Sequence, residues 1–144
     1  MPFRYLDEMT TADVAFEALG ASVEEVFSVA ADATEGVMTQ DISAIRANEE
    51  TVIALTNNGL DLLLLDFLNE LIFLKDARGL LLRVTTISIE KDACVFNLKA
   101  TLAGERIDAS KHVLGIDVKA VTLHALSVTK TDDGTWKATV VLDV

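Results

Sequence analysis

Two aspartates far apart in the sequence, Asp13 and Asp143, have the residue type and surroundings to do chemistry together. The chain stops one residue after Asp143, so this carboxylate is expected beside the free α-carboxylate of Val144. Anions held that close repel one another unless a cation or a proton intervenes. If Asp13 joins them, the hard oxygen donors favour Ca²⁺ or Mg²⁺ over zinc, which prefers histidine or cysteine. The alternative is a solvated chain end and a solvated strand residue.

Lys119 is the second candidate, because it is a single cation in an otherwise apolar stretch. Its stem can pack along a sheet with the ammonium in water, or its charge can face the acidic residues. The outcome depends on the register of the last hairpin. If Thr131 pairs with Thr135, Leu123 lies opposite Asp143, and Lys119 shares a face with Asp143. A slip of one residue separates the two charges.

The two histidines and the cysteine do not form a metal-binding or catalytic motif. His112 falls in a predicted loop and His124 in a predicted strand, and neither has the spacing or the cysteine company of a zinc site. Both are interpreted as hydrogen-bonding residues. Cys94 is predicted to face the core as an inert apolar residue. Because the sequence also lacks a nucleophile elbow, a P-loop and a dinucleotide motif, it does not indicate nucleophilic catalysis.

Composition restricts the partners of this chain. It has 144 residues, a formal net charge of −11 and one cysteine, which indicates a single domain over 1–144 without an intrachain disulfide. Phosphate binding relies on lysine and arginine, so direct nucleic-acid binding is not expected. No signal peptide or membrane span is indicated, and a cytoplasmic location is expected. The acidity suits a cation or a basic protein partner.

Two helices and several strands must position these residues. The stretch Ser22–Glu25 is a capping box that predicts a helix over 23–38. A second helix is expected over 60–74, capped by Asn58 and ended by Gly79, and its apolar residues on all sides predict a buried central position. Its polar strip is interpreted as the wet edge of the helix and consists of Asp66, Asn69 and Glu70.

Strands are expected wherever β-branched residues or alternation dominate. The turn signal Thr131–Gly134 predicts a hairpin between the last two strands, and a long polar loop is expected over 104–117. This order predicts an α+β fold with a mixed, mostly antiparallel sheet packed against two helices. The expected strands are 3–6, 12–19, 50–56, 80–89, 94–102, 118–128 and 136–142.

Four motifs together resemble the archease family, the accessory proteins of RtcB-type RNA ligases. Thr-Ala-Asp-Val-Ala-Phe-Glu-Ala-Leu-Gly spans 11–20, and Leu-Asp-Phe-Leu-Asn-Glu-Leu-Ile-Phe-Leu spans 65–74. Gly-Glu-Arg-Ile-Asp spans 104–108 and is followed by Lys-His and by Asp-Val-Lys-Ala-Val-Thr-Leu-His at 117–124. The last motif is the terminal Val-Val-Leu-Asp-Val. They follow the family's order along nearly the whole chain.

The resemblance implies a compact α+β domain and a non-enzymatic role in tRNA splicing and RNA ligation. Such proteins help the ligase become guanylylated, promote its turnover and broaden its nucleotide use. Carried over by position, Asp13, Asp143 and Val144 match the family's divalent-metal site, described as calcium-binding. Lys119 matches a lysine associated with activation of the ligase.

The chain departs from the family pattern just before Asp13. Many members have a histidine directly before the Thr-Ala-Asp motif and a glycine after Val14. This chain has Met9-Thr10-Thr11 and Ala15 instead. Two other classes of function stay open on the residues alone. They are a small metal-dependent phosphoester hydrolase that uses the same carboxylates, and a purely structural interaction module.

Overall fold

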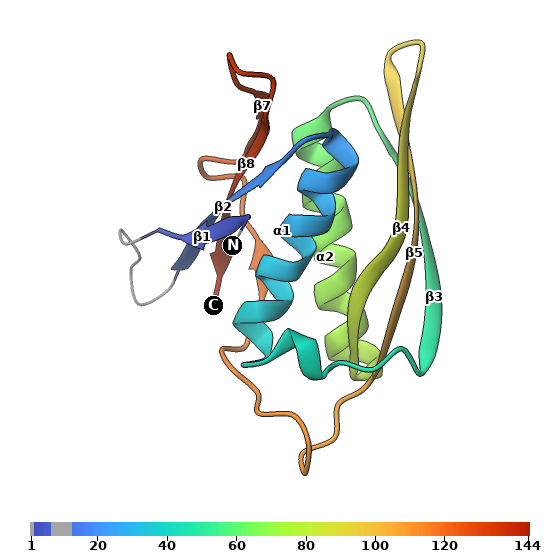
Figure 1. The fold of residues 1–144 in the computed structure, drawn as a ribbon, viewed down its shortest axis with the longest axis vertical. Coiled ribbons are helices and arrows are strands. Elements are labelled where there is room, and N and C mark those ends of the chain that lie inside the picture. Colours follow the sequence, from blue (N-terminus) through green and yellow to red (C-terminus); the bar gives the residue numbers. More distant parts are fainter. Residues whose placement is uncertain (1, 7–12) are drawn as a thin grey trace.

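The computed structural model describes residues 2–6 and 13–144, and its elements form three layers (Figure 1). The helices α1 (Val23–Met38) and α2 (Leu60–Arg78) lie between two sheets. All pairings between the described strands are antiparallel, which confirms the predicted α+β class. The described strands form two sheets where a single sheet was expected. The predicted turn over residues 7–11 and the first residue of the predicted second strand lie outside the described residues.

The two helices follow from capping and apolar content. Ser22 Oγ accepts a hydrogen bond from the Glu25 N–H at 3.1 Å, as the capping box predicts. The prediction that Asn58 caps the second helix is wrong: the N-cap is Gly59, which has no side-chain cap and whose N–H donates to Asn57 Oδ1. It runs beyond Leu74 to Arg78 and ends at Gly79, whose φ of 63° suits glycine. Contacts with both sheets confirm that α2 is central.

The smaller sheet has the strand order β3 (Glu49–Asn57), β5 (Val95–Arg106) and β4 (Leu80–Asp92). Its hairpin is longer than predicted, and the chain reverses at Ala93 and Cys94, where Ala93 has a φ of 57°. The prediction that Cys94 faces the core is therefore wrong, because this residue is exposed in the turn. The extension of β5 to Arg106 also shortens the predicted polar loop.

The larger sheet has the order β1 (Phe3–Tyr5), β2 (Asp13–Gly20), β8 (Trp136–Asp143) and β6 (Ala120–Val121), and β7 (Ser127–Lys130) also pairs with β8. The single strand predicted over 118–128 is wrong. Residues between β6 and β7 leave the ladder in a turn that contains His124 and Ala125, whose φ is 55°. This turn interrupts the alternation of side chains between the two faces. As a result, β6 and β7 pair with β8 in different registers.

The core lies around the helix layer, where Phe27 of α1 meets Phe67 of α2 with ring centroids 6.2 Å apart. Most even-numbered residues of β2 and β8, such as Val14, Phe16 and Leu142, are buried against it. Among the described helices, none has the length and apolar content needed to cross a bilayer.

Candidate functional site: an acidic tip at the end of the larger sheet

The antiparallel register of β2 and β8 places Asp13 directly opposite Asp143. Paired residues in an antiparallel ladder point to the same face, and their neighbours point to the other. Because Val14 and Leu142 are buried against the helices, the two aspartates lie on the outer face. The structure thus brings together two carboxylates from opposite ends of the sequence. We call Asp13, Asp143 and Val144 the acidic tip.

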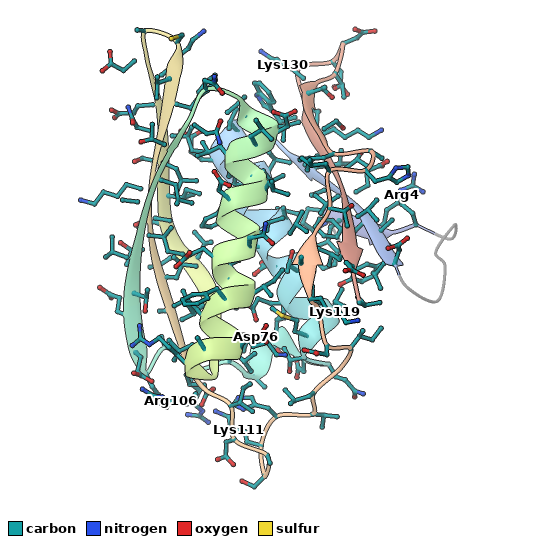
Figure 2. The ribbon with its side chains drawn as sticks, turned by 180° about the vertical axis from the view of Figure 1, so that it is seen from behind. Arg4, Asp76, Arg106, Lys111, Lys119 and Lys130 are labelled. Atoms are coloured by element: carbon teal, nitrogen blue, oxygen red, sulfur yellow. The ribbon has the colours of Figure 1, made fainter. Side chains whose placement is uncertain are left out.

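The position of Lys119 beside the acidic tip is not set by the register of the last hairpin alone. The Thr131 N–H donates to the Thr135 carbonyl at 2.7 Å, so of the two registers left open by the sequence the structure has the one that pairs these residues. Continued without interruption, this register would put Leu123 opposite Asp143, but the turn after β6 puts Ala120 there. The Lys119 N–H then donates to the Asp143 carbonyl at 2.8 Å. The lysine side chain is exposed at this end of the sheet (Figure 2).

Asn69 of α2 holds β6 in this position. Its Oδ1 accepts a hydrogen bond from the Val121 N–H at 2.9 Å. Asn69 is half-buried, which agrees with its place on the edge of the helix, and its side chain also ties the central helix to the strand beside Asp143. Asp66 of the same strip accepts from the Asn57 side chain at 3.0 Å. A polar residue within an apolar helix was the available sequence signal, but its partner is distant in sequence.

The segment between β5 and β6 crosses the ends of the two helices (Figure 1). Gly115 donates its N–H to the Met38 carbonyl at 2.9 Å, and Ile116 donates to the Val37 carbonyl at 2.8 Å. A Cβ on Gly115 would lie 2.4 Å from the Val37 carbonyl oxygen, so the approach requires glycine. These contacts to the end of α1 set the path of the chain toward Lys119.

The start of this segment is secured by Glu105, which sequence reasoning did not single out. The Glu105 carboxylate accepts from Lys111 Nζ at 2.7 and 2.6 Å and from the Arg46 N–H. The Lys111 ammonium and then the Arg46 N–H lower the pKa of Glu105 to about 2, against its partial removal from water. A motif-level signal existed, since Glu105 and Lys111 both fall in the third motif of the resemblance.

His112 is buried beside this carboxylate, and the interpretation that it is a hydrogen-bonding residue is confirmed. Its Nδ1 accepts from the Asp108 N–H at 2.9 Å, which places the proton of the neutral ring on Nε2. Nε2 lies 3.3 Å from Glu105 Oε2, although the two are not aligned for a good hydrogen bond. His124 lies in the turn between β6 and β7, not in a strand.

The acidic tip offers oxygen donors of the kind that Ca²⁺ and Mg²⁺ prefer. Within the part of the chain that the structure describes, no three His, Cys, Asp or Glu side chains converge as a ready-made metal cluster. Asp13 and Asp143 face each other, and Val144 packs on the core and so holds its main chain next to them. Water or a partner would have to supply the remaining ligands. The departure at Met9-Thr10-Thr11 lies outside the described residues.

Comparisons with known proteins agree over almost the whole chain. A sequence model of the Archease protein family (MTH1598/TM1083) matches residues 3–144. The chain is 34% identical to the protein archease of Pyrococcus abyssi over 134 residues, which is 93% of this chain and 94% of that protein. It is 37% identical to the protein archease of Methanosarcina barkeri over 145 residues, covering 99% of this chain and 95% of the relative.

Two solved structures have a similar fold. The solution structure of protein 1598 from Methanobacterium thermoautotrophicum matches with a TM-score of 0.85 at 37% identity, covering 99% of each chain. The crystal structure of an archease from Thermotoga maritima, called a possible chaperone, matches with a TM-score of 0.63 at 26% identity. That match covers 94% of this chain and 93% of the Thermotoga chain.

Proposed function

This chain belongs to the archease family, and on that basis we propose that it is a non-enzymatic activator of an RtcB-type RNA ligase in tRNA splicing. It would promote guanylylation and turnover of the ligase and broaden its nucleotide use. The observation that supports this proposal most directly is the pairing of Asp13 with Asp143 across β2 and β8, next to the Lys119 backbone. The proposed setting is the cytoplasm.

The acidic tip is the proposed working surface. Asp13 and Asp143, with main-chain oxygen from Val144, would hold a divalent cation, which is Ca²⁺ or, as the alternative, Mg²⁺. When bound, the cation would offset the charge of the paired carboxylates and supply a coordination position for nucleotide phosphate. Lys119 would act toward the ligase from the same end of the sheet. With a net charge of −11, the protein would approach a basic surface of the ligase and not the RNA.

Single-turnover guanylylation of the ligase tests the proposal. Asp13→Asn and Asp143→Asn each keep the side-chain size and remove the charge. Each is expected to lower the rate about tenfold, which corresponds to ~1.4 kcal/mol of activation free energy. Asp132→Asn, a matched change in the exposed β7–β8 turn, is expected to leave the rate unchanged. Full activation by both tip variants with an intact fold would overturn the proposal.

Thermal unfolding tests the cation separately. At a concentration 100 times its Kd, a ligand that binds only the folded state stabilises it by about 2.7 kcal/mol. Calcium is expected to raise the Tm of the wild type and of Asp132→Asn, but not that of Asp143→Asn. The same samples, incubated with phosphoesters and Mg²⁺ in the absence of ligase, are expected to show no turnover. Robust hydrolysis there would replace the accessory role with an enzymatic one.

A further inference from the structure

Glu35 of α1 is a fully buried carboxyl group whose side chain has no hydrogen-bond partner among the described residues. Burial raises its pKa to about 8, because water no longer solvates the charged form. The backbone of Leu82 in β4 favours the ionised form but does not meet either oxygen with hydrogen-bond geometry. At neutral pH the group is therefore mostly protonated, and a modest rise in pH ionises it.

Two charged groups from two helices act on the pKa of Glu35, and a third charged group is bound to one of them. Lys75 of α2 lowers the pKa of Glu35, and Asp32, on the preceding turn of α1, raises it. Asp32 is itself held by Arg83 of β4, with Nε and Nη2 at 3.1 and 3.0 Å from its two carboxylate oxygens. Because Arg83 is committed to Asp32, Lys75 is the cation that can respond when Glu35 becomes charged.

Among the described residues, the other elements packed against α1 bring no further charge that shifts the pKa of Glu35. In the larger sheet, charged residues alternate with buried ones and lie on the outer face, where Glu17 pairs with Arg4 and with Lys137 at 3.3 Å each. Asp13 and Asp143 lie on that same outer face. The short helix η1 (Ile42–Ala44) brings Asp41, which is bonded to Ser43.

Lys75 already has a partner on the segment that leads to the acidic tip. Its Nζ lies 3.3 Å from Asp117 Oδ1 and 3.9 Å from Asp76 Oδ1. The Lys75 side chain is 10% exposed and the Asp117 side chain 76% exposed, so the pair joins a nearly buried cation to a solvated anion. Water screens this pair and makes it weak. A charge on buried Glu35 would compete strongly for the same ammonium, because burial increases electrostatic attraction.

Asp117 lies directly before the residues that contact the end of β8. Val118 is buried, and the Lys119 N–H donates to the Asp143 carbonyl. On the other side, Gly115 and Ile116 are bonded to the end of α1, the helix that also carries Glu35. The ion pair with Lys75 is therefore the side-chain tie of this short connection to α2.

We propose that Lys75 is a shared counter-ion that moves from Asp117 to Glu35 when Glu35 loses its proton, and thereby removes the side-chain tie of the segment that carries Lys119. The proton leaves to solvent, and no bond other than O–H breaks. The device is a pH-dependent control of how firmly Lys119 is held beside Asp143. Its consequence for the ligase rests on the proposed function, whereas the exchange itself does not.

Nuclear magnetic resonance of the full chain tests the exchange. The Glu35 side-chain carbon and the amides of residues 115–119 are followed from pH 5.5 to pH 9.5, a range on either side of about 8. In the wild type, both are expected to show the same single-proton inflection. In Glu35→Gln, the inflection at the amides is expected to vanish. If the amides keep it in that variant, or if Glu35 titrates while they do not respond, the proposal is wrong.

Two further variants move the inflection of Glu35 in opposite directions. Lys75→Met removes the stabilising cation, so the inflection rises, and the amides of 115–119 no longer follow it. Asp117→Asn removes the competitor for Lys75, so the inflection falls. Shifts on the order of half a pH unit are expected for a weak, screened pair. Asp76→Asn is the matched control, since Asp76 is the more distant carboxylate on the same helix. Shifts of equal sign in Lys75→Met and Asp117→Asn would contradict the exchange.

A ligase assay distinguishes failure of the proposed pH-dependent control from failure of the proposed function. Activation by the wild type, divided by activation by Glu35→Gln at the same pH, is expected to change across the inflection. A constant ratio, with the resonance inflection present, would overturn the regulatory role. If neither protein activates the ligase at any pH, the proposed function fails, and the resonance data alone decide the exchange.

Discussion

Glu35 and Glu105 are both buried glutamates, yet their surroundings shift their pKa values in opposite directions. Glu105 meets the Lys111 ammonium and a backbone N–H, which hold its charge. Glu35 meets no hydrogen-bond donor among the described residues, and Lys75, the cation that lowers its pKa, is paired with Asp117. Burial without a donor raises the pKa of Glu35, whereas at Glu105 the Lys111 ammonium and the Arg46 N–H outweigh the loss of water. Glu105 therefore secures the start of the segment between β5 and β6, whereas Glu35 is proposed to weaken the tie at its end.

The largest expected effect is on the pH dependence of stability through Glu35. Between its ordinary pKa of 4.5 and its folded value of about 8, the folded state keeps a proton that the unfolded chain has lost. The free energy of unfolding therefore falls as pH rises through this window. The total fall is on the order of 5 kcal/mol, at ~1.4 kcal/mol for each pKa unit. Urea unfolding from pH 5 to pH 9 is expected to show it in the wild type but not in Glu35→Gln.

A second prediction concerns the strand that carries Glu105. A Cβ on Gly104 would lie 1.8 Å from the Leu81 carbonyl oxygen, so β5 can approach β4 here only with glycine. Gly104→Ala is expected to cost about 1–3 kcal/mol, because the two strands must separate. Ala103→Ser, on the preceding residue, is the control. Chemical denaturation measures both, and equal stability of the two variants would contradict the close approach as a constraint.

A third prediction tests the cost of a second buried polar group that, like Glu35, has no hydrogen-bond partner. Asn69→Ala removes the acceptor of the Val121 N–H and leaves that donor without its partner. The expected loss of stability is about 1–2 kcal/mol. Asn69→Asp keeps an acceptor oxygen and should recover most of it. If the alanine variant unfolds like the wild type, β6 does not depend on this bond.

The last prediction concerns the charge of Glu105, whose contribution is tested by lowering the pH. Because its pKa is lowered from 4.5 to about 2, its contribution is present above pH 4.5 and is lost as pH falls toward 2. Glu105→Gln should flatten the acid limb of the stability curve while Glu35→Gln leaves it in place. Circular dichroism during acid titration distinguishes them, and identical acid limbs in wild type and Glu105→Gln would contradict the assignment.

Local sequence signals predicted most of the elements. The capping box at Ser22 and the apolar residues of α2 identified the helices, because these signals depend on neighbours along the chain. The β7–β8 turn was found for the same reason. The errors at Cys94 and in the strand predicted over 118–128 have a common cause. Each depends on where one strand leaves another, which residue types alone do not specify.

For the candidate site, the sequence determined the chemical kind of the residues and the tertiary structure determined their relations. Asp13, Asp143 and Lys119 were identified from residue type and from motifs spread along the chain. Their meeting depended on the registers of β2 and β6 with β8, which are set by the packing of whole sheets on the helices. The opposite behaviour of Glu35 and Glu105 was decided only by the fold, because solvation and the nearest charges come from residues distant in sequence.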